Sequence, residues 1–204
     1  ASAELAIQSQ ISSFFPLKKT KVIIGIARAG NVIGGGDWSE NRLMPDLVRA
    51  IAAGRTLEVR SPNSTRPWQH VLEALSGYLC LGEKLLMGEK DFAQAWNFGP
   101  EADGNLTVVE VLTVLSRLKA IWPALNWKVV DTTKNRRESK LLHLDSAKAR
   151  LRLRWQPVWS FDEGLRATAE WYRANIERGS VISEIQLESY LVSARKVGLL
   201  WSNQ

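Results

Sequence analysis

Short apolar runs along the chain predict strands. The run from Val22 to Ala27 is rich in β-branched residues and has the length of a buried strand in a parallel sheet. Leu57 to Val59 and Ala95 to Phe98 are shorter runs, each bounded by polar or turn-forming residues, and residues 126–131 have the same character. We therefore expect several short strands separated by other elements.

Longer segments with apolar residues three or four positions apart predict helices between these runs. Residues 43–53 form an amphipathic pattern with Pro45 in its first turn and Gly54 as a stop signal. Capping boxes at Thr107 and Ser160 mark two further starts, because a hydroxyl and a carboxylate three residues apart satisfy free backbone amides. Other helices are expected at residues 1–10, 72–86, 145–151 and 183–198. This alternation of strands and helices indicates an α/β fold.

The composition is that of a protein with a packed core. The 204 residues are 45% hydrophobic, which is enough for one or two domains. No apolar run reaches membrane-spanning length and no charged-then-apolar leader is present, so we expect a cytoplasmic protein without a membrane partner. The single cysteine, Cys80, lies in an apolar run and is expected to be buried and reduced. Two histidines and one cysteine give no metal-ligand spacing, so no metal site is predicted.

The positive charge is concentrated in one segment. The formal net charge is +6, and residues 134–154 hold eight basic and two acidic residues, a surplus of six. Leucines that look core-facing interrupt this segment, and no helix-turn-helix or zinc spacing accompanies it. We therefore interpret it as a solvated face with one or two anion-binding arginines, and a nucleic-acid partner is the less favoured reading.

A glycine-rich loop is expected directly after the strand at residues 22–27. Residues 28–38 contain Asn31 and three consecutive glycines, which permit positive φ and do not favour a strand or a helix. Open α/β sheets bind ligands outside the carboxyl ends of their strands, so this loop is a candidate site. The alternative is an ordinary surface loop. Residues 60–67, with two prolines and an asparagine, are expected to form a second turn-rich loop.

Three motifs together are more specific than the glycines. Residues 28–38 (RAGNVIGGGDW), read with residues 66–71 (RPWQHV) and 96–100 (WNFGP), resemble the CDP-glucose 4,6-dehydratases. These are extended short-chain dehydrogenase/reductase enzymes that act on a nucleotide sugar. The resemblance extends from Ala3 to about Trp201, but it covers only the later, carboxyl-terminal part of that family's architecture.

The resemblance implies the architecture. We expect an α/β chain with the last strands of a Rossmann-like parallel sheet and a smaller α/β substrate-binding lobe. Residues 1–30 and 65–98 would be the remainder of the NAD-binding Rossmann-like domain, and residues 31–64 and 99–204 the nucleotide-sugar-binding lobe.

The resemblance also implies the reaction of the complete enzyme. Tightly bound NAD would take hydride from C4 of CDP-D-glucose, water would be eliminated across C5 and C6, and hydride would return to C6 to give CDP-4-keto-6-deoxy-D-glucose. In that family a Tyr-x-x-x-Lys pair and an acid pair carry these steps. Here no tyrosine has lysine four residues later, and the Gly-x-x-Gly-x-x-Gly turn is absent. We therefore expect the catalytic groups and most of the NAD site upstream of Ala1, and this segment alone to be inactive.

Loop arginines are the candidates for the charged part of the substrate. The planar, permanently charged guanidinium of Arg66 suits a diphosphate, and the resemblance gives it that role. Arg60 follows a predicted strand where related enzymes place a residue that stacks on or bonds to the base. Arg42 and Leu43 open a helix whose N-terminus favours anions, and the resemblance places them near the phosphates and base. The alternative for each arginine is a surface position without a ligand.

Two asparagines and one further arginine complete the predicted substrate site. Asn31 and Asn97 lie at strand ends and match asparagines that contact substrate in the family, although each alone is an ordinary turn residue. Arg137 replaces a histidine that the family usually carries, and it could still bind phosphate. We interpret His70 as a structural residue and not as a catalytic base.

Other functions remain open at this level. The chain could belong to another nucleotide-sugar epimerase or dehydratase that uses a different nucleotide, with Arg60 and the glycine loop favouring the CDP form. It could also be a non-catalytic binding or nucleic-acid protein from a split gene. The family usually forms dimers or larger assemblies, so a homo-oligomer is expected.

Overall fold

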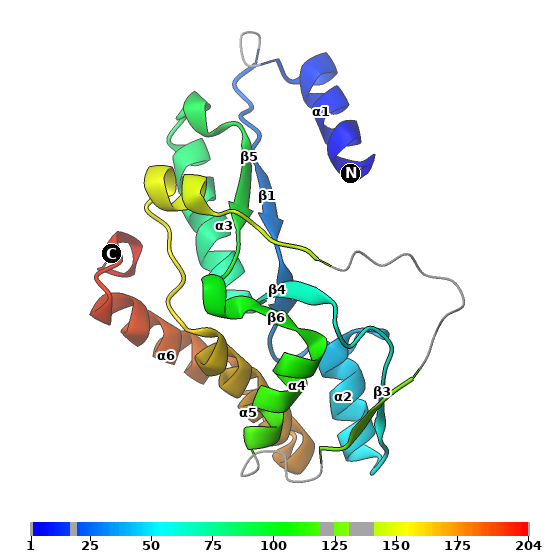
Figure 1. The fold of residues 1–204 in the computed structure, drawn as a ribbon. Helices are drawn as coiled ribbons and strands as arrows, with labels where there is room; N and C mark the ends of the chain where they lie inside the picture. The colour runs from blue at the N-terminus through cyan, green and yellow to red at the C-terminus, as the bar shows by residue number, and fades with distance from the viewer. Residues whose placement is uncertain (1, 17–19, 119–124, 131–140, 204) are drawn as a thin grey trace.

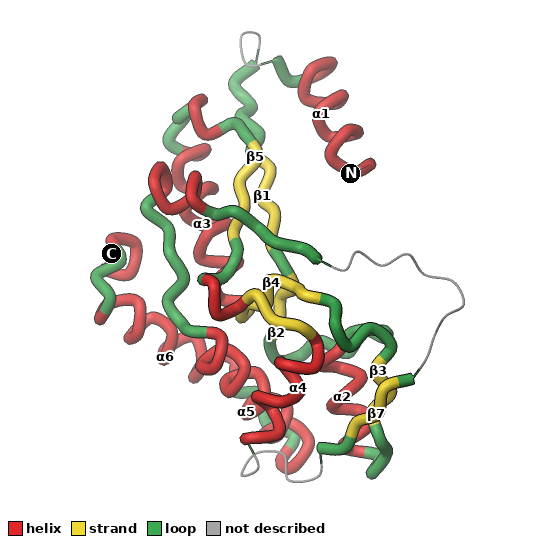
Figure 2. The backbone as a smooth tube through the Cα atoms, viewed as in Figure 1, coloured by secondary structure: helices red, strands yellow, loops and turns green. Residues whose placement is uncertain are grey.

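Helices and short strands are interspersed in the described chain up to Val129, and the named elements after it are helical. The computed structural model describes residues 2–16, 20–118, 125–130 and 141–203, and Figures 1 and 2 show its path. The strands are β1 (Ile26–Ala29), β2 (Asn31–Ile33), β3 (Leu57–Val59), β4 (Thr65–His70), β5 (Ala95–Phe98), β6 (Asn105–Thr107) and β7 (Trp127–Val129). The α-helices are α1 (Ser2–Phe14), α2 (Leu43–Ala52), α3 (Val71–Leu86), α4 (Val108–Arg117), α5 (Phe161–Arg178) and α6 (Ser183–Lys196). The shorter helical turns are η1 (Lys90–Phe92), η2 (Ala102–Gly104), the π-helical η3 (Ala149–Leu153) and η4 (Leu200–Asn203).

The first strand lies later than predicted, and the chain does not enter a loop after it. The run at residues 22–27 predicted a strand, but β1 begins at Ile26 and pairs in parallel with β5. After Gly30 the chain continues as β2, so Asn31 lies in a strand and not in the predicted loop. The glycine permits this path, because a Cβ at position 30 would lie only 2.3 Å from the carbonyl oxygen of Pro67 in β4.

β4 joins two strands that are far apart in the sequence. The predicted loop over residues 60–67 ends at Ser64, because Thr65 already belongs to β4. β4 pairs antiparallel with β6 up to Pro67 and in parallel with β2 from Trp68 onward. Proline, which has no N–H to donate, therefore stands where the strand changes partner. Strand pairing on both sides overrides the turn propensity of this stretch.

The predicted helices and the later strand are present in the described ranges. α2 stops before Gly54, whose φ is +62°, and both capping boxes are formed at Thr107 and Ser160. Asp145 caps the turn before η3 by accepting a hydrogen bond from the Ala147 N–H, at 2.8 Å. β7 lies within the predicted segment 126–131 and pairs in parallel with β3.

α3 covers its predicted segment, whose helix pattern in the sequence rests on Leu72, Leu75, Leu79 and Leu86, but these leucines do not form its buried face. Leu75 and Leu79 are exposed, whereas small residues such as Ala74 and Gly77 face the sheet. A Cβ on Gly77 would lie 2.2 Å from the ring of Phe98 in β5, so only glycine allows this close contact. Close approach of helix and strand decided which face is buried.

Two groups of buried apolar side chains form the core. One joins α2, β3, α4 and α5 around Leu165 and Tyr172. The other joins α3, β5 and η3 around Trp96 and Trp155, and it contains Cys80, which is buried as predicted. These groups correspond to the lower and upper parts of the molecule in Figure 1.

A buried carboxylate connects α3 to α6 and to the segment between η3 and α5. Glu73 is 1% exposed and accepts hydrogen bonds from the Val158 N–H (2.9 Å), the Trp159 N–H (2.8 Å) and the Tyr190 hydroxyl (2.9 Å). Burial raises the pKa of Glu73 to about 7, although these hydrogen bonds act in the opposite direction. The carboxyl group therefore carries a proton in the folded chain at pH values where it would be ionised in water.

His70 also has a structural position. It ends β4, and its Nδ1 atom accepts a hydrogen bond from the Leu72 N–H at 3.3 Å, which caps α3. Burial lowers the pKa of His70 to about 4, so the ring is neutral at pH 7. This arrangement agrees with the structural interpretation made from the sequence.

The core predicts a strong contrast between two leucines. Leu165→Ala in the fully buried core should lower the free energy of unfolding by about 2–5 kcal/mol, because it removes methyl groups and leaves a cavity. Leu79→Ala, at a position 75% exposed, should change it by less than about 0.5 kcal/mol. Urea unfolding followed by circular dichroism measures both, and equal losses would contradict the assignment of the core.

Glu73 and His70 should have opposite effects on the pH dependence of stability. Between about pH 4.5 and 7 the folded chain keeps a proton on Glu73 that the unfolded chain releases, so this group lowers stability as pH rises. Between about pH 4 and 6.5 the unfolded chain holds an extra proton on His70, so that group raises stability as pH rises.

Glu73→Gln removes the contribution of Glu73 to the pH dependence of stability and leaves that of His70. Relative to the unaltered chain, the stability of the variant should therefore rise with pH between about 4.5 and 7, by up to about 1.4 kcal/mol per pH unit. Urea unfolding at a series of pH values gives the two curves. Parallel curves would show that Glu73 does not titrate differently in the folded chain.

Candidate functional site

One large cleft opens beside β2, β3, β4 and the start of α2. Its volume is 1160 Å³. Its lining consists of residues 30–34, 37, 41–46, 57–61, 64, 66, 68 and 108. These segments come from separate parts of the sequence, and the parallel pairing of β2 with β4 brings two of them together.

Five of the predicted substrate residues line this cleft. They are Asn31 at the start of β2, Arg42 and Leu43 at the start of α2, Arg60 after β3, and Arg66 in β4. Three cationic side chains and an amide thus share a single cavity with apolar side chains and with the carboxylates of Asp37, Asp46 and Glu58. Such a cavity can hold a ligand with several negative charges and a flat apolar part.

Of the other two predicted residues, Asn97 is not among the residues that line this cleft. The Asn97 side chain in β5 lies between Arg28 and Asp145: its Oδ1 accepts a hydrogen bond from Arg28 Nη1 (3.3 Å), and its Nδ2 donates to the Asp145 carbonyl (3.0 Å). Arg28 also forms an ion pair with Glu4 of α1. Asn97 therefore joins strand and loop segments outside the cleft. Arg137 lies outside the described residues.

Arg66 is held tightly in the cleft wall. It is only 9% exposed, its backbone pairs with Leu106 in β6, and its Nη1 donates a hydrogen bond to the Thr65 carbonyl at 2.9 Å. A guanidinium on a paired strand loses little freedom when it binds an anion, because its position is already fixed.

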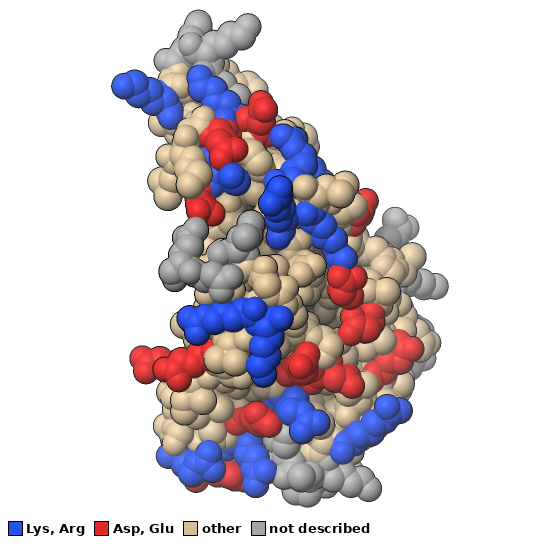
Figure 3. Space-filling model, turned by 90° about the vertical axis from the view of Figure 1, so that its left-hand side faces the viewer, with Lys and Arg blue, Asp and Glu red and all other residues tan. Residues whose placement is uncertain are grey.

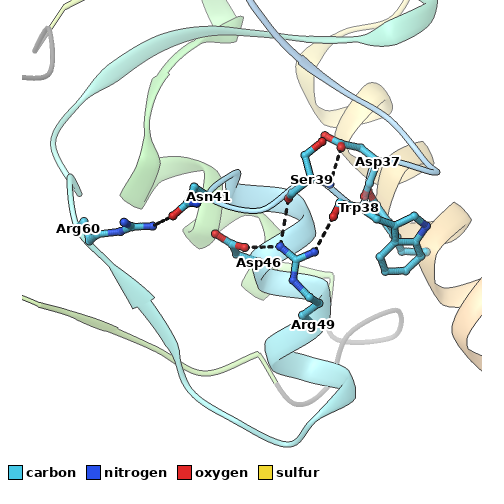
Figure 4. A network of polar contacts seen from close by, with 8 residues as sticks. Asp37, Trp38, Ser39, Asn41, Asp46, Arg49 and Arg60 are labelled. Atoms are coloured by element: carbon cyan, nitrogen blue, oxygen red, sulfur yellow. Dashed lines mark hydrogen bonds and ion pairs between the residues drawn. The ribbon is translucent and has the colours of Figure 1, made fainter.

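The loop between β2 and α2 is fixed by polar contacts at one edge of the cleft. Asp37 accepts hydrogen bonds from the Ser39 N–H (2.9 Å) and from Arg42 Nη1 (3.2 Å). Burial alone would raise the pKa of Asp37, but these two partners outweigh it and lower the pKa. Across the cleft, Arg60 Nη2 donates to Asn41 Oδ1 at 2.8 Å, as Figure 4 shows.

The chain is similar to a known enzyme over most of its length. It is 37% identical over 196 residues to CDP-glucose 4,6-dehydratase of Salmonella typhimurium. The matched region covers 93% of this chain and 53% of that protein. No protein-family model matches. This chain matches the carboxyl-terminal part of CDP-glucose 4,6-dehydratase. The resemblance predicted from the three motifs is thereby confirmed.

Solved structures show the same fold as this chain. UDP-glucuronic acid 4-epimerase from Bacillus cereus, in complex with UDP-glucuronic acid and NAD, superposes with a TM-score of 0.69 at 17% identity, over 84% of this chain and 50% of that one. dTDP-glucose 4,6-dehydratase from Bacillus anthracis, in complex with NAD, gives a TM-score of 0.63 at 19% identity, over 86% and 50% of the two chains. The predicted fold, the later part of a Rossmann-like α/β architecture, is confirmed.

The chain spans about half the length of the curated relative it matches. It is similar in sequence to part of a nucleotide-sugar dehydratase, and it shares its fold with solved nucleotide-sugar dehydratases and epimerases.

The glycine loop of this chain has a packing role as well as a place at the cleft. A Cβ on Gly35 would lie 2.0 Å from the ring of Trp171 in α5, and one on Gly34 would lie 2.8 Å from Val71. Gly36 has a φ of +81° and needs the freedom of glycine. Of the three, Gly34 lines the cleft. The motif therefore lets α5 and α3 support the cleft from behind.

Sequence reasoning missed two polar residues at the edge of the cleft. Asp37 and Asn41 line it and hold Arg42 and Arg60, respectively. A signal was available for Asn41, because an asparagine just before a helix start is a frequent left-handed residue, and its φ is +62°. No signal in the sequence indicated that Asn41 would accept a hydrogen bond from Arg60 across the cleft.

On the face shown in Figure 3, the described basic side chains do not form one continuous surface. Basic and acidic side chains are mixed there. No helix in the described ranges has the length and apolar content that a membrane span requires. Within the same part of the chain, no cluster of three or more His, Cys, Asp or Glu side chains could hold a metal ion.

Proposed function

We propose that this chain supplies the substrate-binding part of an NAD-dependent CDP-glucose 4,6-dehydratase, which converts CDP-D-glucose into CDP-4-keto-6-deoxy-D-glucose. The observation that carries this proposal is the cleft in which Asn31, Arg42, Arg60 and Arg66 meet, in a chain 37% identical to such an enzyme. The structural neighbours support nucleotide sugars as the substrate class, because B. cereus UDP-glucuronic acid 4-epimerase was solved with one bound.

Each part of the substrate has a chemical counterpart in the cleft. Arg66 and Arg42 provide charged donors for the diphosphate. Arg60 can stack on a pyrimidine or donate to its carbonyl oxygen, and Leu43 provides an apolar surface for the ring. Asn31 offers a donor and an acceptor to sugar hydroxyls. Asn97, which does not line this cleft, and Arg137, which lies outside the described residues, stay predictions of substrate contact.

The residues of this chain do not fit NAD phosphates. The sequence lacks the Gly-x-x-Gly-x-x-Gly turn, and the triple-glycine loop is occupied by contacts with Trp171 and Val71. We therefore assign NAD binding and the catalytic tyrosine, lysine and acids to the rest of the complete protein. This chain orients the sugar, which accelerates the reaction by fixing its geometry.

The proposed domain division has partial support from the core. Residues 1–30 and 65–98 would complete the NAD-binding domain, and residues 31–64 and 99–204 would form the substrate lobe. One core group lies mainly in the lobe, but the other combines α3 and β5 with η3, which belongs to the lobe segment. A homo-oligomer and a cytoplasmic location stay expectations of this proposal.

Nucleotide preference tests the proposal directly. The chain should bind CDP-glucose about tenfold or more tightly than UDP-glucose or dTDP-glucose in titration calorimetry, because a mismatched base edge leaves donors unpaired. The complete protein with NAD should release the 4-keto-6-deoxy product from CDP-glucose. Preference for another nucleotide would support a different epimerase or dehydratase, and salt-sensitive DNA binding without nucleotide-sugar binding would support the non-catalytic alternative.

Arg66 should contribute strongly to binding. Arg66→Ala should weaken CDP-glucose binding by about 1.5–3 kcal/mol, the range for hydrogen bonds to charged groups. The control is Arg178→Ala at the end of α5, where the side chain is exposed and distant in sequence from the cleft segments; its affinity should not change. Equal affinities of the Arg66 variant and the unaltered chain for CDP-glucose would contradict the proposal that Arg66 binds the diphosphate.

A further inference from the structure

Three consecutive backbone carbonyls at the edge of the cleft are held by side chains from two helices. Arg49 of α2 donates from Nη1 to the Trp38 carbonyl (2.9 Å) and from Nη2 to the Ser39 carbonyl (3.1 Å). The Tyr172 hydroxyl of α5 donates to the Asp37 carbonyl at 2.6 Å. These carbonyls belong to a loop without strand pairing, so the two side chains replace the partners that a sheet would provide.

Arg49 itself does not line the cleft. Its guanidinium lies on the loop side of α2 and also forms an ion pair with Asp46 one turn earlier, as Figure 4 shows. The guanidinium fork directs separate donors at two adjacent carbonyls, which a single ammonium group cannot do with the same geometry. Arg49 therefore acts on the backbone of the loop and not on a ligand.

A continuous set of contacts connects Arg49 to Arg42 in the cleft. Ser39 accepts from Arg49 through its carbonyl and donates its own N–H to the Asp37 carboxylate. The same carboxylate accepts from Arg42 Nη1, and Arg42 lines the cleft. The position of Asp37, and with it the orientation of Arg42, thus depends on where Ser39 is held.

We propose that Arg49 is a positioning residue for nucleotide-sugar binding: it fixes residues 37–42 so that Asp37 orients Arg42 toward the diphosphate. This role rests on the proposed function, because it assigns Arg42 to the substrate. It adds a residue outside the cleft to those that determine affinity, and it explains why an arginine in the middle of α2 points back at the loop.

A double-mutant cycle tests the connection. Arg42→Met, Arg49→Met and the double variant are titrated with CDP-glucose by calorimetry, with Arg178→Met as the control for loss of an exposed arginine. Arg42→Met and Arg49→Met should each raise the Kd for CDP-glucose about tenfold. The double variant should bind no more weakly than the weaker of these two single variants. The control should bind like the unaltered chain.

A second substitution at position 49 separates the effect of the paired guanidinium donors from the effect of the positive charge. Arg49→Lys keeps the charge but not the paired donors, so its Kd should lie between those of the unaltered chain and Arg49→Met. Thermal unfolding of every variant monitors folding. A purely structural role would lower the melting temperature and give losses of affinity for positions 42 and 49 that multiply in the double variant.

The outcomes distinguish this inference from the proposed function. Normal binding by Arg49→Met, or multiplied losses in the double variant, would overturn the positioning role while the function stands. Absence of CDP-glucose binding by the unaltered chain would overturn the proposed function and this role together.

Discussion

The pairing of β4 with two different strands is the constraint on which the cleft depends. β6 pairs with its first half and β2 with its second half, and the change occurs at Pro67. This arrangement places Arg66 in the cleft wall, buries Trp68 beneath it, and ends in His70, which caps α3. Residues two apart on a strand lie on the same face, as Arg66 and Trp68 do at the cleft, so a one-residue shift of β4 would turn Arg66 away from the cavity.

The cleft is charged, but its charged groups have partners within the chain. Arg42 is paired with Asp37 and Arg60 with Asn41. In the proposed complex a diphosphate would exchange existing contacts for new ones, and the net gain in binding free energy per arginine would be smaller than the strength of an isolated ion pair. Preorganisation compensates for this, because guanidinium groups that are already oriented lose little entropy on binding. The polar edge of the cleft thus favours orientation of a ligand more than raw affinity.

Close packing explains several residues that a functional motif alone would not. Gly35 accommodates the ring of Trp171, Gly77 accommodates Phe98, and Gly30 lets β2 begin beside Pro67. In each case a Cβ would collide with a neighbouring element, so the glycines let helices and strands approach the cleft closely. The triple-glycine sequence therefore records a packing requirement as much as a ligand contact.

The sequence by itself determined the fold class, most helix positions and the resemblance, because helix periodicity, capping boxes and motif spacing are local properties of the chain. It also indicated Arg60 and Arg66 as cleft residues. The tertiary structure alone decided that Asn31 lies in a strand, that Asn97 lies outside the cleft, and that Leu75 and Leu79 of α3 are exposed. Those outcomes depend on contacts between segments far apart in the sequence, such as β2 with β4 and Arg28 with Asn97. A local pattern does not encode which distant partner a strand or a side chain will meet.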